Sequence, residues 1–191
     1  MDKIREHENL RGCAEGMLIR TEEPGDFDIV RELVRLSFKD MEESDHTEHL
    51  LVDRIRRSDA YIPALSLVAE VPGAGVVGHV MLSKVEVVSE KGSVALPGVA
   101  PLSVLPGFQR KGIGGRLLLE AHRRAAEAGY RGALLLGHKD YYPRFGYRRA
   151  SLFGIRFPFD APVECCMAVE FRPGSLDGVH GEVRYPSVFF E

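Results

Sequence analysis

The first part of the chain shows a strand pattern followed by two helical patterns. Segment 17–21, MLIRT, predicts a short strand closed by a Pro-Gly turn. Apolar residues at steps of three and four then predict a helix from an Asp26 cap to Phe38. Its expected apolar face comprises Phe27, Ile29, Val30, Leu33, Val34 and Leu36. A capping box of Asp45 and Glu48 predicts the start of a second helix. The buried stripe of that helix is expected to be Leu50, Leu51 and Ile55.

The middle of the chain is rich in β-forming residues. Runs at 65–71 and 76–88, joined by a hairpin-length turn, and a third run at 94–106 predict an antiparallel meander. Pro97 and Pro101 interrupt the third run. Because proline cannot donate a ladder hydrogen bond, this strand is expected to be bulged, or exposed on one side.

A glycine-rich turn and an amphipathic helix follow the meander. The helix is expected to end before Gly129 and to lead into a buried strand at 132–137. Such a strand, helix and strand unit predicts a right-handed parallel crossover, with Glu120 and Arg124 as an exposed pair. The expected buried stripe is Ile113, Leu117, Leu118, Ala121 and Ala125. A short helical turn and final strands complete a mixed α/β sheet with helices on both faces.

The composition is ordinary for one globular domain. Its 191 residues are 45% hydrophobic and 28% charged, which predicts a single domain over 17–191 and a loose extension at 1–16. The net charge of −3 favours neither nucleic acid nor a membrane surface as a partner. No apolar run approaches the roughly 20 residues of a membrane span, and no signal peptide is evident. Cysteines at 13, 165 and 166 lack framework spacing. A reducing, cytoplasmic location without a metal is expected.

The turn Gln109-Arg110-Lys111-Gly112-Ile113-Gly114 opens the amphipathic helix. A helix amino terminus presents free N–H groups and the positive end of its dipole, so glycines there allow a phosphate to approach closely. The dinucleotide pattern fails because position 117 is leucine, and the Walker pattern fails because positions 113 and 114 are isoleucine and glycine.

The same six residues resemble the Gln/Arg-x-x-Gly-x-Gly/Ala motif of the GCN5-related N-acetyltransferases (GNAT). Tyr142, Gly146 and Tyr147 resemble the Tyr-x-x-x-Gly-Phe signature of that superfamily, with tyrosine in place of phenylalanine. From Met17 nearly to the carboxyl terminus, the order of motifs is similar to that of the YhbS-type predicted bacterial N-acetyltransferases. The resemblance implies the GNAT fold, a mostly antiparallel mixed sheet with one splayed parallel strand pair.

The resemblance also implies the ligand and its site. Acetyl-coenzyme A (acetyl-CoA) is the expected co-substrate, and its pyrophosphate is expected against the helix start. The pantetheine arm is expected between the splayed strands. The implied cofactor-binding residues are Leu102, Ser103, Val104, Gln109, Arg110, Lys111, Gly112, Ile113, Gly114 and Gly115. Arg116 in the first helical turn is expected to help with phosphate charge.

Acetyl transfer needs a neutral amine, a polarised carbonyl and a proton for the departing thiolate. The resemblance implies Tyr142 as the general acid, with Tyr141 the weaker candidate. A backbone N–H of Leu102 or Ser103 is expected to polarise the carbonyl. His138 is a candidate base, while deprotonation through ordered water needs no dedicated base.

The acceptor is expected to be a primary amine on a small molecule or a protein, and it is not identified by the sequence. A non-catalytic CoA-binding sensor or interaction module on the same fold is the alternative. Neither nucleic acid nor membrane is expected as a partner, and a homodimer is compatible with the fold. His46 and His49 are three residues apart without a third ligand nearby, so they are expected to be solvated.

Overall fold

The computed structural model describes residues 16–42 and 44–191, so the predicted extension lies almost entirely outside the described residues. The strands and longer helices are β1 (Leu18–Thr21), α2 (Phe27–Phe38), α3 (Glu48–Arg56), β2 (Tyr61–Val71), β3 (Gly75–Ser89), β4 (Gly92–Val104), α4 (Ile113–Glu127), β5 (Gly132–Leu136), β6 (Arg148–Arg149), β7 (Ile155–Arg156), β8 (Cys166–Glu170) and β9 (Gly181–Arg184). Short 3₁₀ turns are η1 (Pro24–Asp26), η2 (Pro106–Phe108), η3 (Tyr142–Phe145), η4 (Ala150–Phe153) and η5 (Ser187–Phe189).

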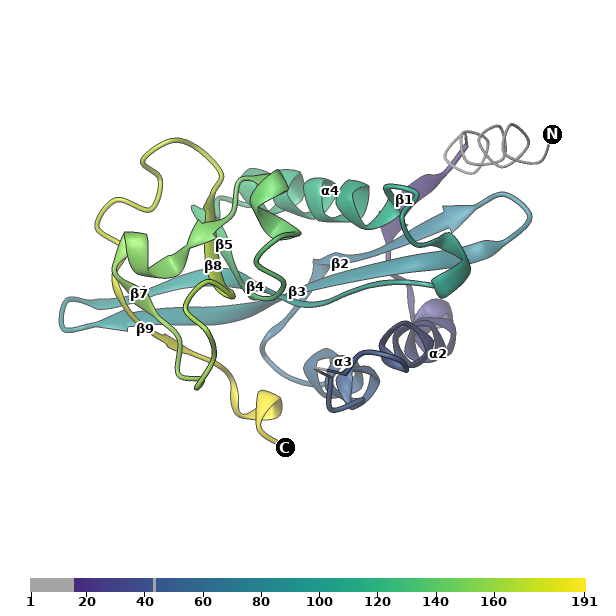
Figure 1. The fold of residues 1–191 in the computed structure, drawn as a ribbon, viewed down its shortest axis with the longest axis horizontal. Coiled ribbons are helices and arrows are strands. Elements are labelled where there is room, and N and C mark those ends of the chain that lie inside the picture. The colour runs from purple at the N-terminus through teal and green to yellow at the C-terminus, as the bar shows by residue number, and fades with distance from the viewer. Residues whose placement is uncertain (1–15, 43) are drawn as a thin grey trace.

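The strands form one mixed sheet between two helical layers. In the described part of the chain the order is β1-β2-β3-β4-β5-β8-β6, with β9 paired to β3 and β7 paired to β9. Helix α4 covers one face, whereas α2 and α3 cover the other (Figure 1). Only the β4–β5 and β7–β9 pairs are parallel among the strand pairs of this described sheet. The predicted mixed α/β sheet with helices on both faces is confirmed.

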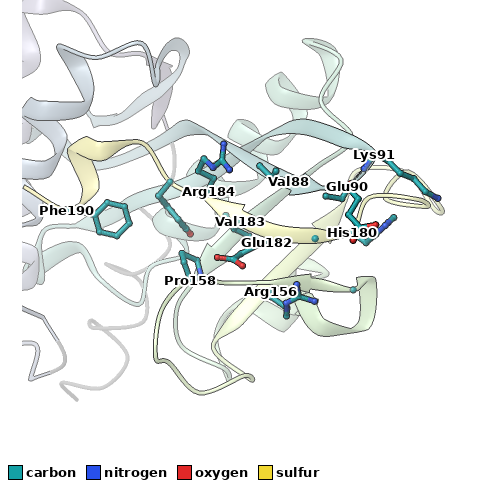
Figure 2. A pocket seen from close by; sticks show the side chains of 14 residues that line it. Val88, Glu90, Lys91, Arg156, Pro158, His180, Glu182, Val183, Arg184 and Phe190 are labelled. Carbon is teal, nitrogen blue, oxygen red and sulfur yellow. Dashed lines mark hydrogen bonds between the residues drawn. The ribbon is translucent and has the colours of Figure 1, made fainter.

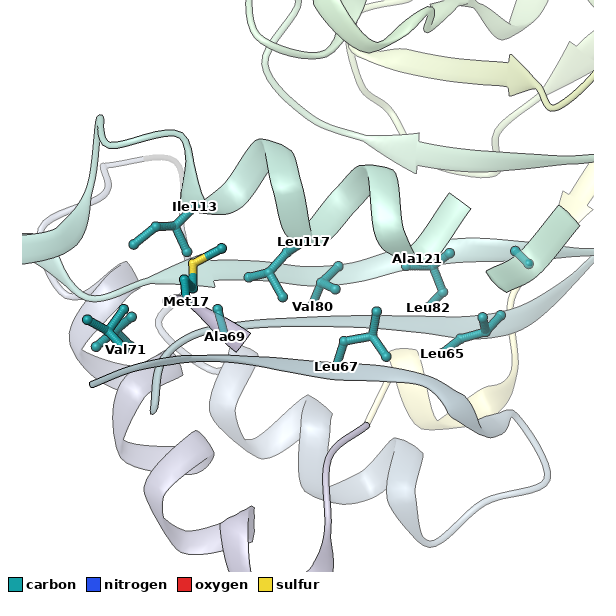
Figure 3. Packing of buried hydrophobic residues seen from close by; sticks show 12 residues of the cluster. Met17, Leu65, Leu67, Ala69, Val71, Val80, Leu82, Ile113, Leu117 and Ala121 are labelled. Atoms are coloured by element: carbon teal, nitrogen blue, oxygen red, sulfur yellow. The ribbon is translucent and has the colours of Figure 1, made fainter. Parts of the chain in front are cut away.

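The core under α4 is built from alternate residues of β2 and β3. Ile113, Leu117 and Ala121 of α4 pack onto Leu67 and Val80 (Figure 3). The whole predicted stripe of α4 is buried. The helix ends as predicted, with Gly129 in the left-handed region at φ 90°, and Arg124 Nε lies 2.8 Å from Glu120 Oε1.

The two helices on the other face depart from their predicted faces. Val30, Leu33 and Val34 of α2 are buried, but Ile29 is 53% exposed. A residue one position from a helical stripe is rotated about 100° away from it, which explains the error at Ile29. Leu50 of α3, which was expected in the buried stripe, is also exposed. Val52, which was not predicted, is buried in the core instead.

The predicted capping box at the start of α3 is wrong. Thr47 is the N-cap residue, and the helix begins at Glu48. Asp45 Oδ1 accepts hydrogen bonds from Thr47 N at 2.9 Å and from Thr47 Oγ1 at 2.7 Å. Asp45 therefore orders the turn before the helix instead of capping the helix itself.

Strand β4 carries the irregularity that its prolines predict. Val80 of β3 pairs with Leu102, and Leu82 pairs with Val99, so β4 uses one more residue than β3 over this interval. The extra residue lies at the cis Ala100–Pro101 peptide. The structure thereby locates the bulge, which the sequence left unplaced. Within the described segments, no helix is both long enough and apolar enough to cross a membrane.

Candidate active site

Strands β4 and β5 pair over a short stretch. Gly98 and Leu134 are the Cα partners of this parallel pair among the described residues. Past Gly98, β4 stays paired with β3 and β5 stays paired with β8 as far as Leu136, which leaves an unpaired stretch, called here the opening, between β4 and β5. The carboxyl-terminal half of β4 consequently presents an edge that β5 does not occupy.

The predicted residues Leu102, Ser103 and Val104 lie on this edge of β4. Leu102 is half-buried and packs toward α4. Ser103 is 2% exposed, and its Oγ has no hydrogen-bond partner among the described residues. Because an unpartnered buried hydroxyl is costly, Ser103 marks a position where a ligand or water is expected to bond. The carbonyl of Val104 accepts from Gln109 Nε2 at 3.1 Å.

The turn that follows is held in a conformation suited to an anion. Arg110 has φ 61° and Gly112 has φ 80°, and both lie in the left-handed region. Gly112 is the N-cap residue of α4, and no side chain caps the helix there. A non-glycine residue in this region costs roughly 1–2 kcal/mol, and such strain concentrates at functional sites. Gln109 ties the turn to β4 by its bond to Val104, so turn and strand form one unit.

Charge at the start of α4 is positive. The first turn contains no acidic residue and includes Arg116. The Lys111 ammonium lies 5.0 Å from the centroid of the Phe108 ring, on the same turn. The amino-terminal N–H groups of a helix have no intrahelical acceptors, and the dipole favours an anion there. The buried side chain of Ile113 leaves its backbone as the group that can face a ligand. These residues fit a bound pyrophosphate.

The glycine turn, the edge of β4 and the tyrosine segment meet at Gly114. A Cβ atom on Gly114 would lie 3.1 Å from the Tyr141 hydroxyl and 3.6 Å from Val104 Cγ2. A Cβ on Gly115 would lie 2.9 Å from Phe145 Cε1. The glycines at 114 and 115 therefore allow aromatic rings to approach the first turn of α4. The spacing of the motif does not predict this second role of the glycines.

Tyr142 begins η3, in the segment after β5, and packs against the cluster that contains Leu118 of α4. Its ring contacts the backbone at Gly137 and packs edge-on to Tyr141 and Tyr147, at centroid distances of 5.0 and 5.7 Å. Burial, with a smaller contribution from Tyr141, raises the pKa of the Tyr142 phenol well above its usual value. Tyr142 is thus a protonated phenol held by packing on three sides.

His138 contributes to the site through its backbone carbonyl, whereas its side chain faces solvent. Its carbonyl accepts from Tyr141 N at 3.1 Å and from Tyr142 N at 3.5 Å, which builds the turn that carries both tyrosines. The imidazole is exposed. No group of three or more His, Cys, Asp or Glu side chains in the described segments is arranged to hold a metal.

One buried pair near the site escaped the sequence interpretation. His122 of α4 and the Tyr147 hydroxyl form a hydrogen bond of 2.8 Å. Burial lowers the pKa of His122 to about 4, so the imidazole is neutral. Tyr147, which replaces the phenylalanine of the family signature, therefore uses its hydroxyl to bond a histidine of α4. Two features of the sequence could have indicated this bond: the tyrosine in place of phenylalanine, and a histidine on the buried face of the helix.

A second polar network is buried beneath α2 and α3. Glu22 accepts from Arg56 and from Ser66 Oγ, and the two side chains of the Glu22–Arg56 pair are 0% and 4% exposed. Ser66 Oγ lies 3.2 Å from His79 Nε2. Burial lowers the pKa of His79 to about 3, which makes it a poor base. This network joins β1, β2, β3 and α3.

Comparison with known proteins identifies the family. A model of the acetyltransferase (GNAT) domain matches residues 18–150. The chain is 33% identical over 155 residues to the uncharacterized N-acetyltransferase YjhQ of Escherichia coli K12, covering 78% of this chain and 82% of that protein. It is 32% identical over 173 residues to the uncharacterized N-acetyltransferase YhbS of the same strain, covering 91% and 98%.

Two solved structures are similar over almost the whole chain. E. coli YhbS in complex with CoA has a TM-score of 0.82 and 29% identity, covering 92% of each chain. A GNAT family acetyltransferase from Brucella melitensis in complex with acetyl-CoA has a TM-score of 0.74 and 33% identity, covering 91% of this chain and 97% of that one. The bulged strand, the glycine turn and these matches together show that the chain belongs to the GNAT family of N-acetyltransferases.

Proposed function

We propose that the protein transfers the acetyl group of acetyl-CoA directly to a primary amine of a small molecule or protein. The observation that carries this proposal is the alignment of three features: the unpaired edge of β4, the left-handed Gly112 and the uncapped start of α4. The E. coli and Brucella relatives, solved with CoA and acetyl-CoA respectively, support the choice of donor.

Backbone groups would hold most of the donor. The N–H groups from Ile113 to Gly115 would face the pyrophosphate, with Arg110 and Lys111 supplying positive charge around it. The backbone of Leu102 and Val104 would bond the pantetheine arm along the edge of β4. An N–H of Leu102 or Ser103 would polarise the acetyl carbonyl as negative charge develops on its oxygen. Positioning of donor and amine would then supply much of the rate.

Tyr142 would donate a proton to the departing thiolate. Its raised pKa keeps the phenol protonated throughout the neutral range. The surroundings that destabilise a phenolate also destabilise a thiolate formed there. Burial therefore raises the pKa of the phenol and of the thiol together, and the proton transfer between them becomes less unfavourable than the pKa of the phenol alone would suggest. His138 remains a candidate base through water, because its exposed imidazole has solvent on its path to the amine.

Two measurements on the intact protein test this function. Isothermal titration is expected to show acetyl-CoA binding, weakened in Gly112→Ala, which strains the turn without a steric clash. Thiol release and mass spectrometry of amines are expected to show acetyl-CoA-dependent product. Absence of binding at high micromolar acetyl-CoA would reject the proposal. Binding without transfer to any amine would identify the alternative, a CoA-binding sensor.

A further inference from the structure

The carboxyl-terminal tail links two hydrophobic clusters on the face of the sheet opposite α4. Tyr185 packs against the cluster that contains Leu134 of β5. Val188 and Phe189 pack against the cluster that contains Ala100 of β4. Figure 1 shows the tail running from β9 toward α3. The tail is therefore a candidate wall for an amine that approaches from this face.

The tail contributes to a group of five aromatic rings, called here the tail aromatic cluster. Tyr185 lies at the centre, with ring centroids 4.9 Å from Phe159, 4.9 Å from Phe189 and 6.3 Å from Phe157. Phe190 extends the cluster at 6.0 Å from Phe159 and is 63% exposed. The other four rings are partly exposed. Exposed apolar groups that gather in one place mark a binding surface more often than single exposed side chains do.

The tail aromatic cluster continues to the end of β5. Cys166 of β8 pairs with Leu136, the last residue of β5. Tyr185 lies near the Cys166 thiol, which adds to the effect of burial in raising the pKa of the phenol. Leu136 is 45% exposed, and Val163 in the loop before β8 is 51% exposed. Apolar side chains are thus exposed at the carboxyl end of β5 as well as in the tail aromatic cluster.

A cavity of about 620 Å³ extends from the same cluster. Tyr185, Phe190 and Pro158 contribute to its lining. Figure 2 shows Phe190 at one end of this cavity, and Lys91 and Glu90 at the other. Its volume lies within the usual range for small-molecule sites, roughly 300–1,000 Å³. The lining also carries charged side chains, among them Arg156, Glu182 and Arg184, so its aromatic part is confined to Tyr185 and Phe190.

We propose that the acceptor is a primary amine carried on an aromatic or branched aliphatic group, which packs against the tail aromatic cluster. This inference rests on the proposed function. The occupant follows from the aromatic rings of the cluster and from the exposed apolar side chain of Leu136 at the end of β5. The same surroundings favour chemistry, because desolvation destabilises the ammonium form and leaves more of the neutral, nucleophilic amine.

Calorimetry on the protein saturated with CoA tests the acceptor class without requiring turnover. The probes are 2-phenylethylamine and 3-methylbutylamine against ethanolamine and putrescine. Burying most of a phenyl or branched alkyl group predicts about 10- to 100-fold tighter binding of the first pair. Equal or tighter binding of the polar pair would overturn the inference.

Thiol release with the same four amines separates the two proposals. Turnover of the polar amines alone would overturn the acceptor class and leave the transferase function standing. Tight binding of the apolar amines without any product from them or from a wider amine panel would support the surface and reject the transferase function.

Phe190→Ala locates the binding surface, because this exposed ring can be removed with little effect on folding. We expect a five- to tenfold loss of affinity for 2-phenylethylamine, with ethanolamine and acetyl-CoA unchanged. Leu119→Ala is the matched control: Leu119 is 53% exposed on α4, which covers the opposite face of the sheet. Identical effects of the two variants on all amines would contradict the assignment. Phe159→Leu, which keeps apolar volume, provides a second variant with the same expected direction.

Discussion

A methyl group at Gly137 would displace the Tyr142 ring without changing the chemistry of the phenol. The backbone of Gly137 is outside the left-handed region, so alanine fits its conformation. An added Cβ would lie 2.5 Å from Tyr142 Cε2 and 3.1 Å from Cδ2, where ordinary contact begins at 3.4 Å. The ring must therefore retreat by about 1 Å, and a misplacement of that size can cost about 100-fold in rate.

The expected Gly137→Ala phenotype is a loss in kcat with little change in donor binding. A 100-fold loss corresponds to about 2.7 kcal/mol of transition-state stabilisation. Overpacking against the Tyr147 and Tyr141 rings should also cost about 1–3 kcal/mol of stability. Thiol-release kinetics with the best acceptor amine would measure kcat, and the KM for acetyl-CoA should stay within threefold of the wild-type value.

The control for Gly137→Ala is Gly25→Ala. Gly25 has no atom within 4 Å of an added Cβ and no positive φ, so its kinetics and melting temperature should match the wild type. Urea unfolding would establish that the Gly137→Ala protein is folded under assay conditions. A folded Gly137→Ala protein with kcat within threefold of wild type would refute the importance given to the position of Tyr142.

Further predictions concern buried groups and the strained turn. Tyr147→Phe should cost about 1–2 kcal/mol in urea unfolding, because it leaves the buried His122 imidazole unpaired. The pKa of His122, about 4, is below its value in the unfolded chain, so the buried neutral imidazole contributes fully to stability above about pH 6.5. As the pH falls toward 4 this contribution is lost, by about 2 kcal/mol at pH 5. A free energy of unfolding that stays constant from pH 7 to pH 5 would contradict this prediction. Glu22→Gln should cost about 2 kcal/mol, because it removes one of the two carboxylates that pair with the buried Arg56 and leaves Asp53 as the other. Glu32→Gln in an exposed pair should change stability by less than about 0.5 kcal/mol, as thermal melts can show. Arg110→Gly should raise stability by up to about 1 kcal/mol by relieving the left-handed strain, yet weaken acetyl-CoA binding severalfold in calorimetry; unchanged affinity would remove Arg110 from the donor site.

Local rules predicted most of the fold because they depend on neighbours in the sequence. The β-rich runs at 65–71 and 76–88 and the apolar stripe of α4 were sufficient for the meander and the crossover. Pro97 and Pro101 predicted an irregular β4, but its position at Ala100–Pro101 depends on the register with β3. The apolar faces of α2 and α3 failed at Ile29 and Leu50, since the direction of the sheet beneath a helix is not encoded locally.

The candidate site likewise has one part that the local sequence predicted and another that depends on contacts between distant segments. The turn from Gln109 to Gly115 was recognisable from spacing and family resemblance, and the structure adds its left-handed conformation. The contacts of Gly114 and Gly115 with aromatic rings, and the bond between His122 and Tyr147, join segments far apart in the sequence. The tail aromatic cluster likewise forms only when β9 pairs with β3 and brings Tyr185 next to Phe159. No periodic pattern indicates such meetings.

Acetyl transfer by Tyr142→Phe, compared with Tyr141→Phe, tests the central claim most directly. Both substitutions remove one hydroxyl from adjacent residues, and titration with acetyl-CoA would show whether each protein still binds the donor. With a bound donor and a saturating apolar amine, single-turnover thiol release should fall at least about 100-fold in Tyr142→Phe, the range expected on loss of a general acid. Tyr141→Phe should remain within about threefold of wild type. Equal rates in the two variants, or a larger loss in Tyr141→Phe, would contradict the assignment of Tyr142 as the proton donor of an acetyl-CoA-dependent N-acetyltransferase.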